Sequence, residues 1–227
     1  MSDSLYKRSN LARVPELQKL IPEGATAFFQ FMHQAFAPKL LSARTKELIA
    51  VAVTHVTGCP YCIDVHTGKF KGYQGTPQEA VEAVLVAGAV NAETVLFHSA
   101  NAINTMSGNG GPEDPLYQTS NMDVYNNEAK LMSPAAFEAF DRFTEEAFRE
   151  GSVDAKTKQL IAFVIAHVNG CAYSIDRHSR RLADVGATRE EALEALLIGG
   201  VANAGYVLTH GINALNAFDQ AGVAANS

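Results

Sequence analysis

The sequence predicts an all-α protein with two similar helical lobes, and three observations support this fold class. No stretch of useful length alternates apolar and polar residues, as a half-buried strand would. Alanine is frequent, aromatic residues make up only 8% and Trp is absent, a composition that suits helices packed closely through small side chains. The same pattern of residues also occurs twice along the chain.

The repeat is an internal duplication without gaps. Cys59 and Cys171 are 112 residues apart, and this offset aligns the two halves over more than a hundred residues. Three pairs of segments carry the match: Ala43–Ala50 with Ala155–Ala162, Gly58–His66 with Gly170–His178, and Asn91–His98 with Asn203–His210. The join is expected near Ser107–Pro115, which is dense in Gly and Pro. We therefore expect a first lobe at 1–110 and a second at 111–227.

Each lobe is expected to open with a variable lead-in and then a helix that starts close to Pro22 or Pro134. In the first lobe Phe28, Phe31 and Phe36 fall at i, i+3 and i+8, a helical spacing. The equivalent aromatic positions recur in the second lobe.

The next helix in each lobe follows a good N-cap residue, Ser42 or Asp154, and ends at Gly58 or Gly170. It is apolar nearly all round, so it should be a buried central helix. A further helix starts at the cysteine motif, where Pro60 occupies a position suited to the first helical turn.

The last helix of each lobe is long and rich in Ala. It is preceded by Thr76-Pro-Gln-Glu79 in the first lobe and by Thr188-Arg-Glu-Glu191 in the second. Both segments have the spacing of a capping box, in which a threonine and a glutamate satisfy each other's backbone N–H groups.

Composition excludes several classes of protein. Hydrophobic residues make up 47% of the chain, which excludes a disordered protein. A net charge of −6 without a basic run argues against binding to nucleic acid or to an anionic membrane. No uninterrupted apolar stretch approaches the roughly 18–20 residues that cross a bilayer. The start of the chain lacks the apolar segment of a signal peptide, so the expected compartment is the cytosol.

Cys59-Pro-Tyr-Cys62 is the main candidate for chemistry. The start of a helix favours an anion, so a thiolate on Cys59 or Cys62 is expected to have a lowered pKa. The spacing also lets the two sulfurs form a disulfide. A metal site is the alternative, but it needs further ligands, for which only His55 and His98 are at hand.

Two further residues surround the cysteines. His66 lies one turn after Cys62 on the same helix face and can take the thiol proton. Glu47, on the preceding apolar helix, lies at i, i+7 and i+11 with Thr54 and Gly58, so its stripe ends beside the motif. It could orient His66 or relay a proton. Alternatively, His66 is a surface histidine and Glu47 an ordinary first-turn glutamate.

Other polar residues near the motif favour structural roles. His55 and His98 recur in both halves, which structure explains as well as catalysis. Tyr61 and Tyr173 could cover a lobe interface, and Asp64 and Asp176 could be helix-start charges.

Glu47, Cys59-Pro-Tyr-Cys62 and His66 together resemble the motif of the AhpD-like alkylhydroperoxidases within the carboxymuconolactone decarboxylase superfamily. The resemblance covers about 22–106 and 134–218. It implies an antiparallel helical fold that assembles into trimers or hexamers. It also implies that Cys62 attacks a hydroperoxide and Cys59 resolves the product as a disulfide, with Glu47 and His66 as the proton relay.

The second half departs from this motif. Gln159 replaces the glutamate and Ser174 the attacking cysteine, while Cys171 and His178 remain. A serine beside a histidine is a possible nucleophile, but no acid is in place to orient the histidine. We therefore expect one redox site per chain, with Cys171 as a leftover thiol. The second lobe is expected to be kept for packing, where it could supply interface surface and wall the active cleft.

The leading hypothesis is a thiol-dependent peroxidase or disulfide oxidoreductase that cycles Cys59 and Cys62. It would use a hydroperoxide and a thiol or dithiol donor protein, without cofactor or metal, as a homo-oligomer (a dimer or a trimer). The first alternative is a decarboxylase-type acid–base enzyme acting on a small carboxylated lactone through Glu47 and His66. The second is a redox-sensing oligomer without turnover.

Overall fold

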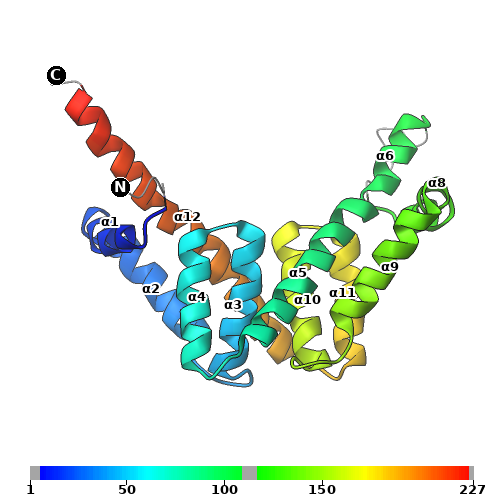
Figure 1. The fold of residues 1–227 in the computed structure, drawn as a ribbon, viewed down its shortest axis with the longest axis horizontal. Helices are drawn as coiled ribbons and strands as arrows, with labels where there is room; N and C mark the ends of the chain where they lie inside the picture. The colour runs from blue at the N-terminus through cyan, green and yellow to red at the C-terminus, as the bar shows by residue number, and fades with distance from the viewer. Residues whose placement is uncertain (1–5, 109–116, 225–227) are drawn as a thin grey trace.

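The computed structural model describes residues 6–108 and 117–224, and this part of the chain contains helices and turns but no strand (Figure 1). The first half comprises the 3-10 helix η1 (Arg8–Arg13) and the helices α1 (Val14–Leu20), α2 (Pro22–Phe36), α3 (Ala43–Thr57), α4 (Pro60–Gly72), α5 (Pro77–Phe97) and α6 (Ser99–Met106). The second half comprises α7 (Asn121–Val124), the π-helical turn η2 (Tyr125–Ala129), α8 (Lys130–Met132), α9 (Pro134–Phe148), α10 (Ala155–Asn169), α11 (Ala172–Asp184) and α12 (Arg189–Ala224). The all-α prediction is confirmed.

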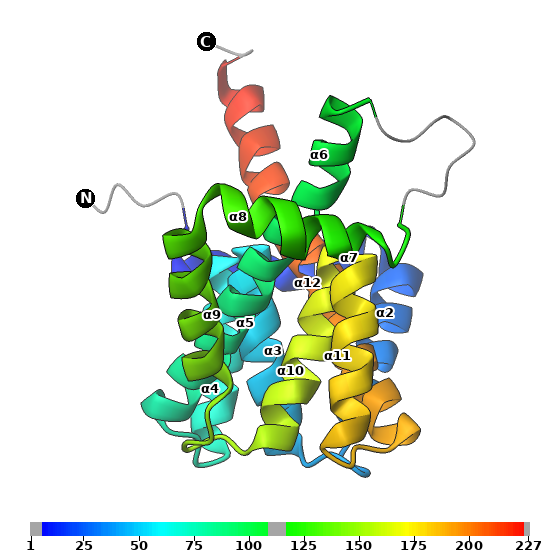
Figure 2. The same cartoon turned by 90° about the vertical axis from the view of Figure 1, so that its right-hand side faces the viewer.

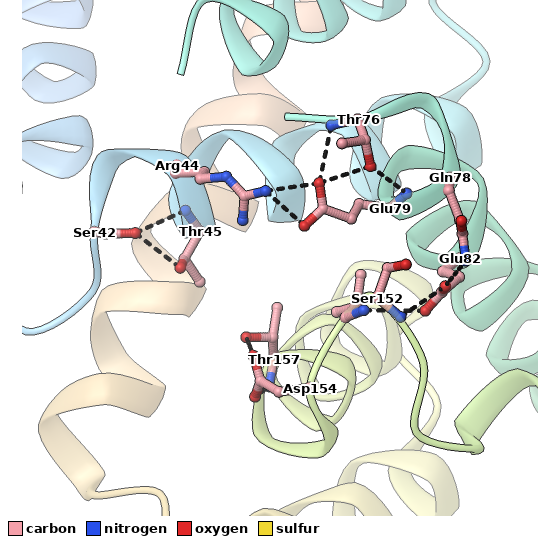
Figure 3. A network of polar contacts seen from close by, with 11 residues as sticks. Ser42, Arg44, Thr45, Thr76, Gln78, Glu79, Glu82, Ser152, Asp154 and Thr157 are labelled. Carbon is pink, nitrogen blue, oxygen red and sulfur yellow. Dashed lines mark hydrogen bonds and ion pairs between the residues drawn. The ribbon is translucent and has the colours of Figure 1, made fainter. Parts of the chain in front are cut away.

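The predicted helix ends are also confirmed. The Ser42 hydroxyl accepts the Thr45 N–H at the start of α3, and Asp154 accepts the Thr157 N–H at the start of α10 (Figure 3). At the other ends of these helices, Gly58 and Gly170 both have φ of 69°, a left-handed conformation that favours glycine.

Both predicted capping boxes form, at Thr76–Glu79 and at Thr188–Glu191. The Glu79 carboxylate has a second function. It also accepts two hydrogen bonds from Arg44, and so joins the start of α5 to the start of α3 (Figure 3).

The core lies around the two central helices, α3 and α10. The apolar run Leu48–Val53 on α3 and its counterpart Leu160–Ile165 on α10 are buried almost completely. They belong to one continuous cluster together with residues of α5 and α12. The two lobes therefore share a hydrophobic core.

The long helices connect the lobes by crossing between them. α5 packs on α3 of its own half and also on α10, α11 and α9 of the other half. α12 packs on α10 and also on α3, α4 and α2. The ends of these helices diverge (Figures 1 and 2). The end of α12 projects above α1 and α2, while α6, which follows α5, projects beside α8. Each lobe is thus covered by the long helix of the other, α5 or α12.

Two buried lysines bind across the interface between the halves. Lys46 Nζ lies 2.9 Å from the Glu194 carboxylate and donates to the carbonyls of Ala35 and Ala37. Its counterpart Lys158 lies 3.2 Å from Glu82, whose carboxylate also accepts backbone N–H groups of the second half (Figure 3). These contacts repeat the duplication in three dimensions.

The expected join near 110 lies outside the described residues, so the boundary between 1–110 and 111–227 stays a prediction.

Two stretches, Pro77–Met106 and Arg189–Ala221, are long and apolar enough to cross a membrane by length and composition. Of their apolar windows, 44% and 33% respectively are buried inside the protein. Core helices pass the same test, so this is weak evidence for membrane spans.

Candidate functional site

The cysteine pair lies at the start of α4, where the sequence predicted it. Cys59 is the N-cap residue and its sulfur accepts the Cys62 N–H at 3.3 Å, while Pro60 occupies the first helical position. Both cysteines are free thiols. Cys59 is fully buried, whereas Cys62 retains 8% of its surface. Of the two thiols, Cys62 is therefore the accessible one.

Glu47 and His66 meet beside the cysteines. α3 buries the Glu47 carboxylate against α4, where His66 Nδ1 donates a hydrogen bond to Glu47 Oε2 at 2.7 Å. The other ring nitrogen, Nε2, remains available as a base when the imidazole is neutral. Phe36 stacks on the imidazole with ring centroids 5.5 Å apart, and Lys69 Nζ lies 3.9 Å from Glu47. The histidine is held in one orientation.

The expectation of a lowered thiol pKa is wrong for Cys62. Burial raises the pKa of Cys62, and the neighbouring Cys59 sulfur raises it further, to about 12. A hydrogen bond with Thr209 acts in the opposite direction but is the smaller effect. Burial is thus the main reason, and the helix start does not offset it, because the Cys62 N–H points to the Cys59 sulfur rather than to the Cys62 sulfur.

A cavity of about 480 Å³ opens beside Cys62. One wall is the α4 face with Cys62, His66 and Lys69, and Cys59 does not reach it. The remaining walls come from η1, α1, α2 and α12 and are mostly apolar, including Leu11, Val14, Leu17, Phe28, Met32 and Leu208. An apolar molecule in this cavity would contact the thiol and the imidazole together.

The sequence indicated that the second lobe could wall the cleft, but it did not identify the α12 residues that do so. Gly205 and Thr209 come from the second half of the chain and line the cavity of the first. A signal was present in the repeat: within the matched segments Asn91–His98 and Asn203–His210, these positions hold Glu93 and Phe97 in the other half. Positions where a duplicate differs from an otherwise similar copy mark places where the two sites differ.

The structural alternatives hold for several residues. His55 Nδ1 donates to the Val51 carbonyl of its own helix, as His167 does to Phe163. The Tyr61 hydroxyl donates to Asn213 of α12 and accepts from Asn10, so this tyrosine covers an interface between the halves. The remaining pairs are structural too: Tyr173 with Asn101, Asp64 with Arg8, and Asp176 with Arg180.

The second half holds a closed version of this arrangement. His178 Nδ1 donates to Gln159 at 3.3 Å, and Phe148 stacks on His178 as Phe36 stacks on His66. Ser174 and His178 are fully buried. Cys171 is also fully buried.

A carboxylate reaches this second site from α5. Glu93 Oε1 lies 3.2 Å from His178 Nε2, and Glu93 Oε2 lies 3.2 Å from Arg177. Burial raises the pKa of Glu93, but His178, Arg177 and Ser174 together outweigh it and hold the pKa below its ordinary value. The acid that the sequence motif lacks is thus supplied by the other half, on the opposite side of the imidazole.

Among the described residues, no group of three or more His, Cys, Asp and Glu side chains is placed to hold a metal ion.

The chain is similar in sequence to a known protein family and to individual proteins of two bacteria. The model of the carboxymuconolactone decarboxylase family matches it twice, at 22–104 and 134–217. An uncharacterised protein of the Paracoccus denitrificans cox locus is 35% identical over 83 residues, which cover 37% of this chain and 75% of that protein. The alkyl hydroperoxide reductase AhpD of Mycobacteroides abscessus is 39% identical over 56 residues, covering 23% of this chain but only 32% of the reductase.

A solved structure has the same fold over nearly the whole chain. It is a candidate gamma-carboxymuconolactone decarboxylase subunit from Burkholderia xenovorans, with a TM-score of 0.67, 18% identity and 97% of each chain covered. The family model covers most of this chain, in two copies that coincide with the duplication. The chain is therefore a member of the carboxymuconolactone decarboxylase family that contains the family domain twice.

Proposed function

We propose that the chain is a thiol-dependent peroxidase that reduces organic hydroperoxides through Cys62 and Cys59. The observation that carries the proposal is the cavity wall, where Cys62 and His66 lie side by side. Behind them, Glu47 holds the imidazole and Cys59 lies against Cys62. The similarity to AhpD, an alkyl hydroperoxide reductase, supports the same chemistry.

In the first step His66 Nε2 takes the Cys62 proton, and Glu47 stabilises the resulting imidazolium. The thiolate sulfur attacks the outer oxygen of the hydroperoxide, so an S–O bond forms and the O–O bond breaks. The alkoxide leaves as an alcohol after taking the proton from His66. Cys62 becomes a sulfenic acid, having supplied two electrons.

In the second step the Cys59 sulfur attacks the Cys62 sulfur. The S–S bond forms, the S–O bond breaks, and hydroxide leaves as water with the Cys59 proton. A thiol or dithiol donor protein then reduces the disulfide. The proposed compartment is the cytosol, and the proposed oligomer is a dimer or a trimer. The hydroperoxide is reduced and the donor is oxidised, so the cycle balances.

The test is a count of free thiols before and after one equivalent of cumene hydroperoxide. The wild-type protein should lose two of its three thiols, and Cys171→Ser should lose both of its remaining ones. Cys62→Ser should lose none and form no disulfide. Survival of all three wild-type thiols under a modest excess of oxidant would overturn the proposal.

A second candidate function is acid–base catalysis on a small carboxylated lactone. The raised pKa of Cys62 favours it because a neutral thiol is a poor nucleophile, whereas the Glu47–His66 pair can move a proton without it. Lys69 lines the same cavity and is a cation for a substrate carboxylate. Cys62→Ser distinguishes the two functions: it abolishes peroxide reduction but leaves most of a lactone decarboxylase activity.

A further inference from the structure

The two pseudo-equivalent sites differ in how much space lies beside the nucleophile position. At the first site α12 presents Gly205 and Thr209 to the cavity that contains Cys62. At the second site the same two positions belong to α5 and hold Glu93 and Phe97. The replacements are therefore a carboxylate for a hydrogen atom and a phenyl ring for a small hydroxyl side chain.

Glu93 and Phe97 fill the space that the first site leaves open. Each is only 1% exposed. Glu93 extends to His178 and Arg177, while the Phe97 ring packs edge-on against Tyr125 with ring centroids 4.9 Å apart. At this second site Ser174 and His178 have no exposed surface at all.

Next to Gly205, the side chain of Phe28 leaves little room for a larger residue. A Cβ atom at this position would lie 3.4 Å from Cζ of Phe28, which is ordinary van der Waals contact. Alanine therefore fits, but a longer side chain must extend into the cavity beside Cys62. α12 thus fixes the width of the cavity at this point.

We propose that Gly205 and Thr209 are specificity-determining residues, which admit a bulky apolar substrate to Cys62, and that Glu93 and Phe97 close the second site. On the proposed peroxidase function, on which this part rests, the preferred substrates are hydroperoxides with a bulky aryl or branched alkyl group. The cavity of about 480 Å³ and its mostly apolar walls fit such a group far better than hydrogen peroxide alone.

The first experiment measures access to Cys62 without requiring turnover. In a Cys59→Ser, Cys171→Ser background, Cys62 is the single thiol. Its alkylation rate is measured with small iodoacetamide and with bulky N-phenylmaleimide. Gly205→Leu and Thr209→Phe should lower the N-phenylmaleimide rate by about tenfold or more, because filling a pocket discriminates by size. In Gly205→Leu the iodoacetamide rate should change by less than about threefold. Thr209→Phe also removes the hydrogen bond that lowers the pKa of Cys62, so for this variant the ratio of the two rates is the readout.

The matched control is Gly88→Leu. Gly88 is an exposed helical glycine on α5, and a Cβ there meets nothing within 4 Å. This variant should leave both alkylation rates unchanged. Equal losses with the two reagents in Gly205→Leu, or no loss with either, would overturn the proposal.

A reciprocal variant tests closure of the second site. In a chain without native cysteines, Ser174→Cys should resist N-phenylmaleimide because that position is fully buried. Adding Glu93→Gly and Phe97→Thr should expose the new thiol and raise its alkylation rate by about tenfold or more. A thermal melt verifies that the triple variant is folded. A folded triple variant that stays unreactive would show that other side chains close the site.

Turnover then separates this inference from the proposed function. With the native cysteines, Gly205→Leu should lower kcat/KM for cumene hydroperoxide by about tenfold but leave the value for hydrogen peroxide within about threefold. If the wild type reduces no hydroperoxide while the labelling selectivity holds, the peroxidase proposal fails and the assignment of Gly205 and Thr209 stands. If peroxides are reduced without size selectivity, the peroxidase proposal stands and the assignment of Gly205 and Thr209 fails.

Discussion

At the scale of single residues, the two sites keep an equivalent histidine, but the carboxylate beside it comes from a different position in the chain. His66 receives its carboxylate from Glu47 on the preceding helix of the same half. His178 has lost that acid to Gln159, but Glu93 from the other half approaches the opposite ring nitrogen. The first histidine therefore has a free nitrogen at a cavity, whereas the second is enclosed between two helices. The imidazole of His66 lines a cavity, and that of His178 is buried inside the protein.

The residues of the motif could be predicted from the sequence, but their electrostatics could not. The stripe through Glu47 and Thr54 correctly indicated that Glu47 lies near the cysteine motif, because helical periodicity is a local property. The pKa of Cys62 depends instead on burial by helices distant in sequence and on where the Cys59 sulfur points. Local pattern carries no information about either.

The raised pKa of Cys62 predicts an unusual pH dependence of its reactivity. The rate of its alkylation by iodoacetamide should rise about tenfold per pH unit from pH 7 to 10 without levelling, because the thiolate is a minor species below about 12. Cys59→Ser should shift the curve to lower pH, since Cys59 is the second cause of the shift. Peptide mapping by mass spectrometry follows Cys62 separately. A plateau reached by pH 8 would contradict the prediction.

The raised pKa of Cys62 also makes the free energy of unfolding depend on pH. A thiol whose pKa is higher in the folded than in the unfolded protein favours folding in its protonated form. This contribution is complete below pH 9, the ordinary pKa, and is lost as the pH rises toward about 12. Between these limits the free energy of unfolding should therefore fall more steeply with pH in the wild type than in Cys62→Ser, as measured by urea denaturation.

At the scale of the helices, local signals identified the boundaries and missed the crossings. Ser42, Asp154 and Gly58 define helix ends through bonds to residues a few positions away, so sequence suffices to find them. The crossing of α5 and α12 between the halves depends on which apolar faces meet, and each face could equally have packed within its own half. Residues of η1 and α1 also line the cavity. This could not be predicted either, because nothing in the cysteine motif indicates which segments cover it.

The buried Lys46 joins α3 to Glu194 of α12, and Lys46→Met tests this connection. This change leaves Glu194 without its cation and removes the donor to the Ala35 and Ala37 carbonyls. Breaking a buried pair in this way should lower the free energy of unfolding by about 3–5 kcal/mol. Urea denaturation followed by circular dichroism gives the value.

An exposed ion pair of similar chemistry supplies the control for Lys46→Met. Arg180 and Asp176 lie on the surface of α11 with side chains 75% and 57% exposed. Arg180→Met should leave the free energy of unfolding nearly unchanged, since solvent screens this pair. Equal losses in the two variants would mean that the interface lysine contributes no more than a surface charge.

At the scale of the whole molecule, the two duplicated halves share one hydrophobic core. The shared core contains residues of both halves, and the site in each half is completed by the long helix of the other half, α12 or α5. The second half is therefore more than a packing relic, because Gly205 and Thr209 line the cavity of the first. The sequence revealed the repeat and suggested that the second lobe could wall the cleft. It did not identify the residues that do so, because those contacts arise only when helices distant in sequence meet.

Expression of the predicted lobes as separate chains tests this dependence. Residues 1–110 alone would expose the faces of α3 and α5 that pack on α10 and α12. Burial of these apolar faces is the main source of stability, so a monomeric half should show no cooperative thermal transition. Coexpression with 111–227 should give a 1:1 complex that unfolds cooperatively, as measured by light scattering and circular dichroism. A homodimer of one half would support the same dependence, with a second copy in place of the missing half. A monomeric half that unfolds cooperatively would instead establish two independent domains, and the cavity beside Cys62 would then have formed between domains rather than within a single core.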